Sequence, residues 1–238
     1  MYGNGKAESL IKEVISDKKR DDLFLVSKVL PNNAGKHRLE RALDDSMKRM
    51  GVEYLDLYLL HQAMGDYFSA WRAMEDAYKE GKLKAIGVSN FYAHLLVNFV
   101  NTVEIKPMVN QVELHPYYTQ EKALETMKYY DVIPEAWAPL GGGRYKPFED
   151  EMLKGIAAKY NKSVGQVLLR WNVQRGVVVV PKSTHVERIK ENIDIFDFEL
   201  NEEEMKQISS LDMGYSGSRA KHFEPDFVRM VLNNKIHD

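Results

Sequence analysis

The sequence predicts an α/β fold with a parallel sheet, and three observations lead to that prediction. Short apolar runs rich in β-branched residues recur along the chain, and each is short enough to be a strand. Between these runs, apolar residues repeat at the i, i+3, i+4, i+7 spacing of an amphipathic helix. Successive runs lie about 25 to 45 residues apart, which leaves room for the helical crossover that parallel neighbours need. We therefore expect repeated strand-helix units.

Six runs are predicted to be strands, namely 23–26, 55–60, 85–88, 108–112, 132–137 and 177–180. The predicted helices cover 7–15, 39–50, 68–74, 149–160, 164–171 and 201–211. The expected helix ends agree with these ranges. Gly51 and Gly176 follow helical stripes, and Ser163 and Asn201 are candidate N-caps, the latter with Glu204 three residues later.

The length of the chain narrows the fold class further. No Pro-, Gly- or Ser-rich linker interrupts the 238 residues, so we expect a single domain over residues 1–238. A (β/α)₈ barrel is typically about 250 residues long. The chain is near that length but shows only six strands, because additional helical segments occupy the difference. The sequence thus predicts about six parallel strands of a barrel-type fold with surrounding helices.

Composition excludes several classes of function. The chain has no cysteine, so disulfide-stapled modules and thiolate chemistry are excluded. The formal net charge of -2, without a local basic patch, gives no reason to expect a nucleic acid or an anionic membrane as a partner. The longest apolar runs, such as 177–180, are far shorter than the roughly 20 residues of a membrane span, and the first residues lack the apolar stretch of a signal peptide. We expect a soluble, cytoplasmic protein.

Polar residues stand at the carboxyl ends of nearly all predicted strands. In a parallel barrel these ends share one face, and the catalytic residues lie on that face. The residues are Lys28, His61, Ser89, Asn90, Gln111, Glu113, Trp137, Lys182 and Ser183. Taken singly, a His after a strand is more often a hydrogen-bonded core residue, and a Lys is usually a solvated rim residue. Together, a Lys, a His and an amide at one mouth can polarise a carbonyl and relay a proton.

The segment 181–184 has the features of an anion site. It ends a strand and opens a helix that carries Arg188, so a Lys, two hydroxyls, helix N–H groups and a guanidinium gather there. Solvated charges at a helix start are the alternative interpretation. The glycines 141–143 follow neither the G-x-G-x-x-G nor the Walker pattern, which argues against a Rossmann or P-loop site. No His pair has metal-ligand spacing and His115 precedes a Pro at a loop start, so no metal is expected.

An ordered set of motifs resembles the aldo-keto reductases through almost the whole chain. The motifs are Tyr2-Gly3-Asn4, Ser27-Lys28 at a strand end, Asp56-Leu57-Tyr58-Leu59-Leu60-His61, Gly87-Val88-Ser89-Asn90-Phe91, Asn110-Gln111-Val112-Glu113-Leu114-His115-Pro116, Trp137-Ala138-Pro139-Leu140-Gly141, and Val180-Pro181-Lys182-Ser183 with Arg188 and Asn192. Each motif alone is weak evidence, whereas their order and spacing are specific. The short segment after His61 resembles the small-substrate bacterial and protist members.

The resemblance implies a (β/α)₈ barrel that transfers hydride from NADPH to a small aldehyde or ketone. It assigns Tyr2 as the proton donor, Lys28 as the group that lowers the pKa of Tyr2, and His61 as the residue that orients the substrate. A phenol has a pKa near 10, so a nearby ammonium is the physical means of making it a usable acid near neutrality.

The resemblance also implies a set of cofactor contacts. Ser89, Asn90 and Gln111 would hold the carboxamide of the nicotinamide. Trp137 stands where the family usually has a Tyr stacked on that ring, and an indole stacks equally well. Leu140 is a further implied contact. Lys182, Ser183 and Arg188 would bind the 2′-phosphate of the adenosine. Glu191 and Asn192 would lie near the adenine. These contacts imply a preference for NADPH over NADH.

The chain departs from the family pattern at its N-terminus. The family has a catalytic Asp a few positions before the Tyr, in a segment that also carries the first two strands and the first helix of the barrel, whereas this sequence starts at Met1-Tyr2. We therefore expect a truncated barrel that lacks those elements and whose outer strands become edges, which favours self-association or low stability. The full-length form is expected to be a monomer. The alternative to a reductase is a non-catalytic NADP(H)-binding or interaction protein.

Overall fold

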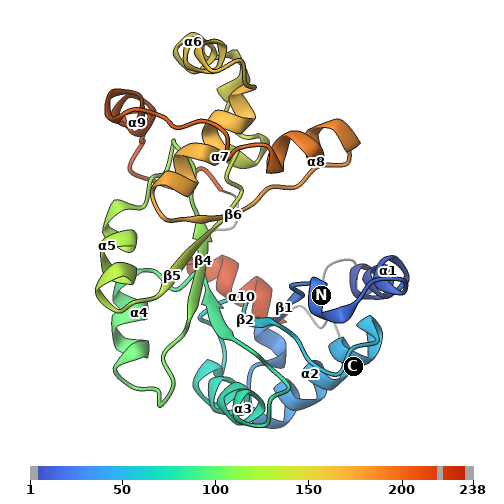
Figure 1. Cartoon of the computed structure of the whole chain (residues 1–238). Helices are drawn as coiled ribbons and strands as arrows, with labels where there is room; N and C mark the ends of the chain where they lie inside the picture. Colours follow the sequence, from blue (N-terminus) through green and yellow to red (C-terminus); the bar gives the residue numbers. More distant parts are fainter. Residues whose placement is uncertain (1–4, 219–221, 234–238) are drawn as a thin grey trace. The chain divides into compact units, whose positions relative to one another are not determined.

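The computed structural model describes residues 5–218 and 222–233 (Figure 1). The chain divides into two compact units, one formed by residues 1–110 with 220–238 and the other by residues 111–219. Tyr2, the predicted proton donor, lies outside the described residues.

Six strands form one sheet in chain order, β1-β2-β3-β4-β5-β6. Their bounds are Val26–Val29 (β1), Leu57–Leu60 (β2), Ile86–Ser89 (β3), Val109–Glu113 (β4), Ile133–Trp137 (β5) and Val178–Val180 (β6). The pairs β1–β2, β2–β3 and β5–β6 are parallel. The prediction of parallel strand-helix units is confirmed, and β1 and β6 stand at the two ends of the strand order.

The first strand was predicted too early in the chain, at 23–26. Its pairing with β2 begins at Val26 and runs through Val29. Phe24 is 70% exposed, and the N–H of Leu25 donates to the carboxylate of Asp56 at 2.7 Å. The apolar run therefore leads into the strand, which begins at the last residue of the run, Val26, and continues through Ser27, Lys28 and Val29.

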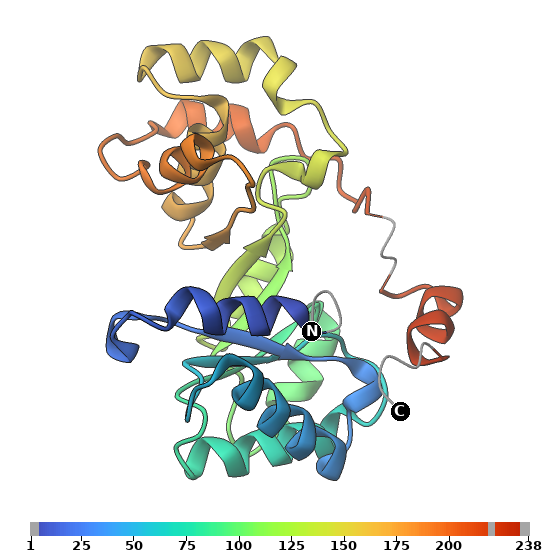
Figure 2. The same cartoon turned by 90° about the vertical axis from the view of Figure 1, so that its right-hand side faces the viewer.

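Among the described residues, the first unit has five helices, which are drawn in Figures 1 and 2. They are α1 (Lys6–Ile15), α2 (Lys36–Met50), α3 (Tyr67–Lys79), α4 (Ala93–Val100) and α10 (Pro225–Asn233), with short 3-10 turns η1 (Arg20–Asp22) and η2 (Pro31–Asn33). Helix α1 packs on α2, and α2 packs on α3. The predicted stop at Gly51 is confirmed, since this residue caps α2 with a left-handed φ of 69°.

Helix α1 forms as predicted, but much of its apolar stripe is not buried. Leu10 is 58% exposed and Val14 is 70% exposed. The residue that α1 buries is instead Glu8, whose carboxylate accepts a hydrogen bond from Ser27 Oγ at 2.7 Å and pairs with Arg49 Nε at 2.6 Å. A buried ion pair, rather than apolar packing alone, fixes this helix on β1 and α2.

The part of the second unit that the structure describes, residues 111–218, contains five helices and two 3-10 turns. They are α5 (Glu121–Tyr129), η3 (Gly141–Gly143), η4 (Pro147–Glu149), α6 (Glu151–Lys159), α7 (Val164–Gln174), α8 (Val186–Ile193) and α9 (Glu202–Ser209). Ser163 and Asn201 are N-caps with complete capping boxes, as predicted. The anion segment differs slightly from its prediction, because α8 begins at Val186 and leaves Lys182 in the loop before it.

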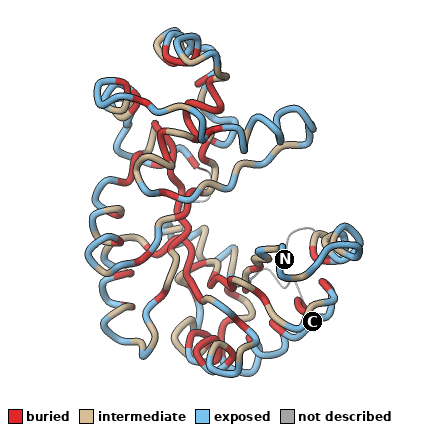
Figure 3. The backbone as a smooth tube through the Cα atoms, viewed as in Figure 1, coloured by how far each residue is buried: buried red, intermediate tan, exposed pale blue. Residues whose placement is uncertain are grey.

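Burial concentrates on the central strands (Figure 3). All four residues of β2 and of β3 are buried. Gly87 on β3 permits the close approach of its neighbours, since a Cβ there would lie 2.6 Å from Leu59 Cδ2 and 2.7 Å from the carbonyl oxygen of Val109. In contrast, α8 buries none of its residues. Over the described parts of the chain, no helix combines the length and apolar character that a membrane crossing requires.

Candidate functional site

Two predicted catalytic residues lie at the carboxyl ends of neighbouring strands in the first unit. Lys28 is on β1, and His61 directly follows β2. The backbone N–H of His61 donates to the carbonyl oxygen of Val29 at 3.1 Å, which ties the two strand ends together. The parallel register therefore brings the ammonium and the imidazole to one edge of the sheet, as the sequence predicted.

The imidazole of His61 is held in its neutral form. Burial, reinforced by the positive charge of Lys28, lowers the pKa of His61 from 6.5 to about 3. At physiological pH the ring thus carries one N–H donor and one acceptor nitrogen. A neutral imidazole beside an ammonium can hydrogen-bond the oxygen of a polarised carbonyl without adding a second positive charge.

Ser89 and Asn90 complete this group of residues. Both are buried, and Asn90 adopts a left-handed φ of 61° directly after β3. Its Nδ2 donates to the carbonyl oxygen of His61 and to Ser89 Oγ, each at 3.1 Å. We call Lys28, His61, Ser89 and Asn90 the strand-end cluster. Hydrogen bonds among buried groups fix its geometry.

Gln111 and Trp137 lie on strands of the second unit. Gln111 is 4% exposed on β4, and its amide donates to the carboxylate of Glu135. Trp137 is the last residue of β5 and is half-buried. Both are placed at strand positions, as predicted, but neither lines the large pocket of this unit.

A pocket of about 1070 Å³ lies entirely in the second unit. It is lined by six residues of the predicted cofactor set, namely Leu140, Lys182, Ser183, Arg188, Glu191 and Asn192. We call it the α8 pocket. Apolar side chains, including Pro139, Phe148 and Val180, also line it. Its lining therefore offers both apolar surface and polar groups, the combination that a nucleotide-sized ligand requires.

The polar part of the α8 pocket is positively charged. The permanent charges in its lining are Lys182 and Arg188 against the single carboxylate of Glu191. Within residues 5–218 and 222–233, neither Lys182 nor Arg188 forms a hydrogen bond or ion pair with another residue. These two cations are exposed at the start of α8, so they are available to an anionic ligand.

The pocket wall includes residues that sequence reasoning did not select, among them Tyr145 and His185. Tyr145 stacks on Tyr117 with ring centroids 4.4 Å apart and an angle of 7°, and its hydroxyl accepts a hydrogen bond from the N–H of Gly217 at 3.1 Å. No local pattern signals these contacts. The position of His185 beside the predicted anion segment was visible in the sequence.

Glu113, the other polar residue predicted at the end of β4, is used inside the protein. Its carboxylate is buried, accepts hydrogen bonds from Arg144 and Ser216, and lies 3.2 Å from His115 Nε2. Burial raises the pKa of Glu113, but the hydrogen bonds and the charge of Arg144 outweigh it and hold the pKa below 4.5. Because Arg144 directly follows Gly142 and Gly143, which line the pocket, this ion pair anchors the loop.

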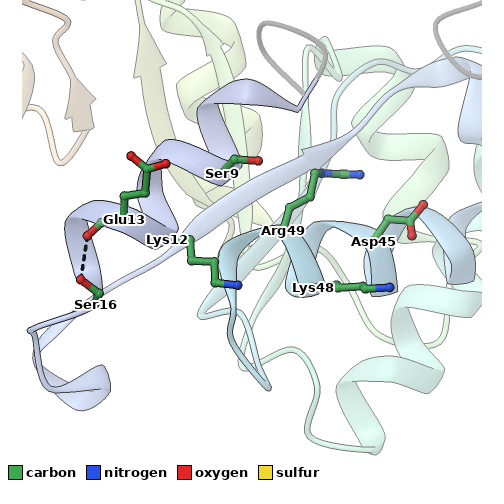
Figure 4. Close-up of a pocket in the computed structure, with 7 residues that line it drawn as sticks. All are labelled: Ser9, Lys12, Glu13, Ser16, Asp45, Lys48 and Arg49. Atoms are coloured by element: carbon green, nitrogen blue, oxygen red, sulfur yellow. Dashed lines mark hydrogen bonds between the residues drawn. The ribbon is translucent and has the colours of Figure 1, made fainter.

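A second pocket, of about 790 Å³, lies between α1 and α2 in the first unit (Figure 4). Its lining residues are Ser9, Lys12, Glu13, Ser16, Asp45, Lys48 and Arg49. Ser16 donates to the backbone oxygen of Glu13 at 2.8 Å. The lining mixes both signs of charge and includes none of the predicted site residues.

Known proteins resemble this chain in both sequence and structure. The sequence matches the model of the Aldo/keto reductase family over residues 1–213. It is 48% identical to glyoxal reductase of Bacillus subtilis over 194 residues, which cover 81% of this chain and 70% of that protein.

Solved structures agree. An aldo-keto reductase from a Medee basin deep-sea metagenome library has 38% identity and a TM-score of 0.85, over 87% of this chain and 79% of that one. An aldo-keto reductase of Bombyx mori in complex with NADP has 32% identity and a TM-score of 0.86, over 93% and 81%. The family resemblance inferred from the ordered motifs and the parallel α/β fold predicted from the strand-helix pattern are thereby confirmed.

Proposed function

The chain belongs to the aldo/keto reductase family, and we propose on that basis that it is an NADPH-dependent reductase of small aldehydes or ketones. The α8 pocket would hold the phosphorylated adenosine part of the cofactor. The strand-end cluster would hold the carbonyl substrate and the carboxamide of the nicotinamide.

The single observation that supports this proposal most is the lining of the α8 pocket. Residues from two distant segments, Leu140 and the 182–192 stretch, meet in one pocket of about 1070 Å³. Its two cations have no partner within the described residues. A dinucleotide with an additional phosphate supplies the anion that Lys182 and Arg188 lack and an apolar face for Pro139 and Phe148.

The proposed chemistry divides between cofactor and protein. When bound, the cofactor supplies the hydride that adds to the carbonyl carbon. The neutral imidazole of His61 orients the carbonyl oxygen through a hydrogen bond, and Tyr2 delivers the proton that this oxygen gains. The Lys28 ammonium favours the deprotonated form of the Tyr2 phenol, which lowers its pKa toward neutrality. The carbonyl thus gains one hydride and one proton and becomes an alcohol.

The proposed substrates are small carbonyl compounds of the glyoxal class. This assignment follows from the relative named glyoxal reductase, which is 48% identical to this chain. We propose the cytoplasm as the place of action, as expected from the sequence, and fractionation of cells that produce a tagged chain tests that location.

Two measurements test the proposal together. Titration with NADPH and with NADH, followed by fluorescence, should give tighter binding of NADPH. NADPH consumption in the presence of glyoxal or methylglyoxal, followed at 340 nm, should then reveal turnover. Binding without consumption on a panel of aldehydes would favour the alternative of a non-catalytic NADP(H)-binding protein. If neither NADPH nor NADH bound, both the reductase and the non-catalytic binding protein would be ruled out.

A further inference from the structure

We propose that the exposed apolar face of α8 is the interface through which two copies of this chain form a two-fold symmetric dimer. Four residues make up this surface, namely Val186, Ile189, Ile193 and Phe196, and we call it the α8 face. The inference goes beyond the proposed function and does not depend on it, because none of the four residues lines the α8 pocket.

The α8 face is an apolar stripe that lies open to solvent. Val186, Ile189 and Ile193 follow the i, i+3, i+7 spacing of one helix face. They are 64%, 53% and 73% exposed, and Phe196, three residues beyond Ile193, is 66% exposed. No other helix in the described residues exposes three large apolar side chains. Single exposed apolar residues are ordinary, whereas a group of them marks a site of protein–protein contact.

The stripe and the α8 pocket use different sides of the same helix. At 3.6 residues per turn, the pocket residues Arg188 and Glu191 lie on the opposite side of α8 from Ile189 and Ile193. Helix α8 packs on α7 and lies at the surface of the second unit (Figure 1). A partner can therefore cover the α8 face while the pocket stays accessible to its ligand.

The apolar area of the α8 face matches what a stable dimer buries. With residue areas of about 150–200 Å², the exposed fractions of the four residues leave roughly 450 Å² of apolar surface on each copy. A standard interface buries about 800 Å² per partner, and about 65% of a homodimer interface is apolar, which gives roughly 500 Å². The α8 face alone thus supplies nearly all the apolar area of such an interface.

The stripe is self-complementary about a two-fold axis. Val186 and Ile193 are the first and last residues of α8, so they lie at equal distances from its midpoint, and Ile189 lies next to that midpoint. When two α8 helices cross in opposite directions, Val186 of one copy meets Ile193 of the other, and the two Ile189 side chains approach each other at the axis. An isologous contact of this kind buries the same patch on both copies and closes at two chains.

The charges beside the stripe favour a second copy over a charged partner. Glu187 and Lys190 border the stripe on one side, and they pair with each other at 3.4 Å. The border on that side therefore presents no net charge that would select an acidic or a basic protein. Apolar side chains that match themselves are left as the basis of recognition.

Light scattering after size-exclusion chromatography, from about 1 to 100 μM chain, tests the inference. Wild type should shift with concentration from the mass of one chain to twice that mass. Ile189→Glu and Ile193→Glu should weaken association by at least about tenfold, because each would bury a carboxylate against an apolar partner. Both should fold, since α8 buries none of its residues. Val14→Glu, at a 70% exposed valine on α1, is the matched control and should dimerise like wild type.

A cross-link locates the axis. The chain has no cysteine, so Ile189→Cys introduces a single thiol. Two such thiols at the axis should form a disulfide between copies when air oxygen oxidises them, whereas the thiols of Val14→Cys should stay unlinked.

Three results would overturn the inference: a wild-type monomer at every concentration, undiminished association of Ile189→Glu and Ile193→Glu, or assemblies larger than two chains, which an isologous contact does not form. None of these results bears on the proposed function, which titration with NADPH tests separately.

Discussion

The residues near His61 and those near Arg188 differ in burial and in hydrogen bonding. In the strand-end cluster, Ser89 and Asn90 are buried, and Asn90 donates hydrogen bonds to Ser89 and to the backbone of His61. In the α8 pocket, the cations Lys182 and Arg188 are exposed and have no partner within the described residues. Hydrogen bonds join members of the first group to one another, whereas the second group offers donors that a ligand would satisfy.

The difference fits the role that we propose for each region. A group that orients a reacting carbonyl needs a fixed position and a fixed protonation state, and burial provides both, as the lowered pKa of His61 illustrates. A group that holds a phosphate needs charge and access, and burial would impose a desolvation cost on it. Substitutions in the first unit should therefore change stability and turnover, and substitutions in the pocket should change affinity.

Arg49→Met, which breaks the ion pair with Glu8 in the first unit, is expected to have the largest effect. The substitution leaves the carboxylate of Glu8, which is 5% exposed, without its ion-pair partner. Removing one partner of a buried pair costs about 3–5 kcal/mol, and we expect about 3 kcal/mol because Arg49 itself is 27% exposed. Urea unfolding measures the loss. The neighbouring exposed Lys48→Met is the control, and equal stability of the two variants would contradict the prediction.

Lys28→Met is expected to lower turnover without changing the affinity for the cofactor. Loss of the ammonium should lower kcat for aldehyde reduction by at least about 10²-fold, the low end of general acid-base catalysis, and Tyr2→Phe should do the same. The Kd for NADPH should stay unchanged, because the proposed phosphate contacts are elsewhere. Lys36→Met, an exposed lysine that pairs with Asp76, serves as the control. Turnover at the wild-type rate in Lys28→Met would remove the proton-relay assignment.

Much of the fold was predictable because its signals are local. The stripes at helical spacing predicted α2, α3 and α7, and the capping patterns at Ser163 and Asn201 predicted two helix starts. The first strand was misplaced for a physical reason. Ser27 is polar, yet it is buried in β1, where its hydroxyl donates a hydrogen bond to the carboxylate of Glu8. A single-sequence pattern does not reveal that distant partner.

The candidate site was predictable to the extent that it follows from topology. Parallel strands place their carboxyl ends together, which is why Lys28 and His61 could be grouped before the structure was known. Contacts between distant segments could not be predicted in the same way. Arg144 and Ser216, which bind the carboxylate of Glu113, lie 31 and 103 residues from it in the sequence.

Arg188→Ala tests the exposed cations of the α8 pocket. A charge-assisted hydrogen bond is worth about 1.5–3 kcal/mol, so loss of this guanidinium should weaken NADPH binding by roughly 10- to 100-fold and leave NADH nearly unchanged. Unfolding free energy should not change, because Arg188 is exposed. Lys190→Ala is the control on the same helix, since Lys190 pairs with Glu187 and does not line the pocket. An equal loss for both dinucleotides would mean that Arg188 acts on structure.

The smallest effect concerns the protonation of His61. Its pKa is lowered to about 3 in the folded chain, so the unfolded chain, with an ordinary value of 6.5, binds the proton first as the pH falls. The stability that the neutral ring contributes is complete above pH 6.5 and is lost progressively from there down to pH 3. Between pH 6.5 and 5.5, wild type should lose about 1 kcal/mol of unfolding free energy through this residue. Carboxylates contribute little in this window, because the lowered pKa values of Glu8 and Glu113 act below pH 4.5.

Urea unfolding at the two pH values should show this loss in wild type and in the exposed-histidine control His94→Gln, but not in His61→Gln. A His61→Gln variant that retained the full loss would mean that the imidazole is not held neutral, and the contrast between the buried cluster and the open pocket would lose its clearest example.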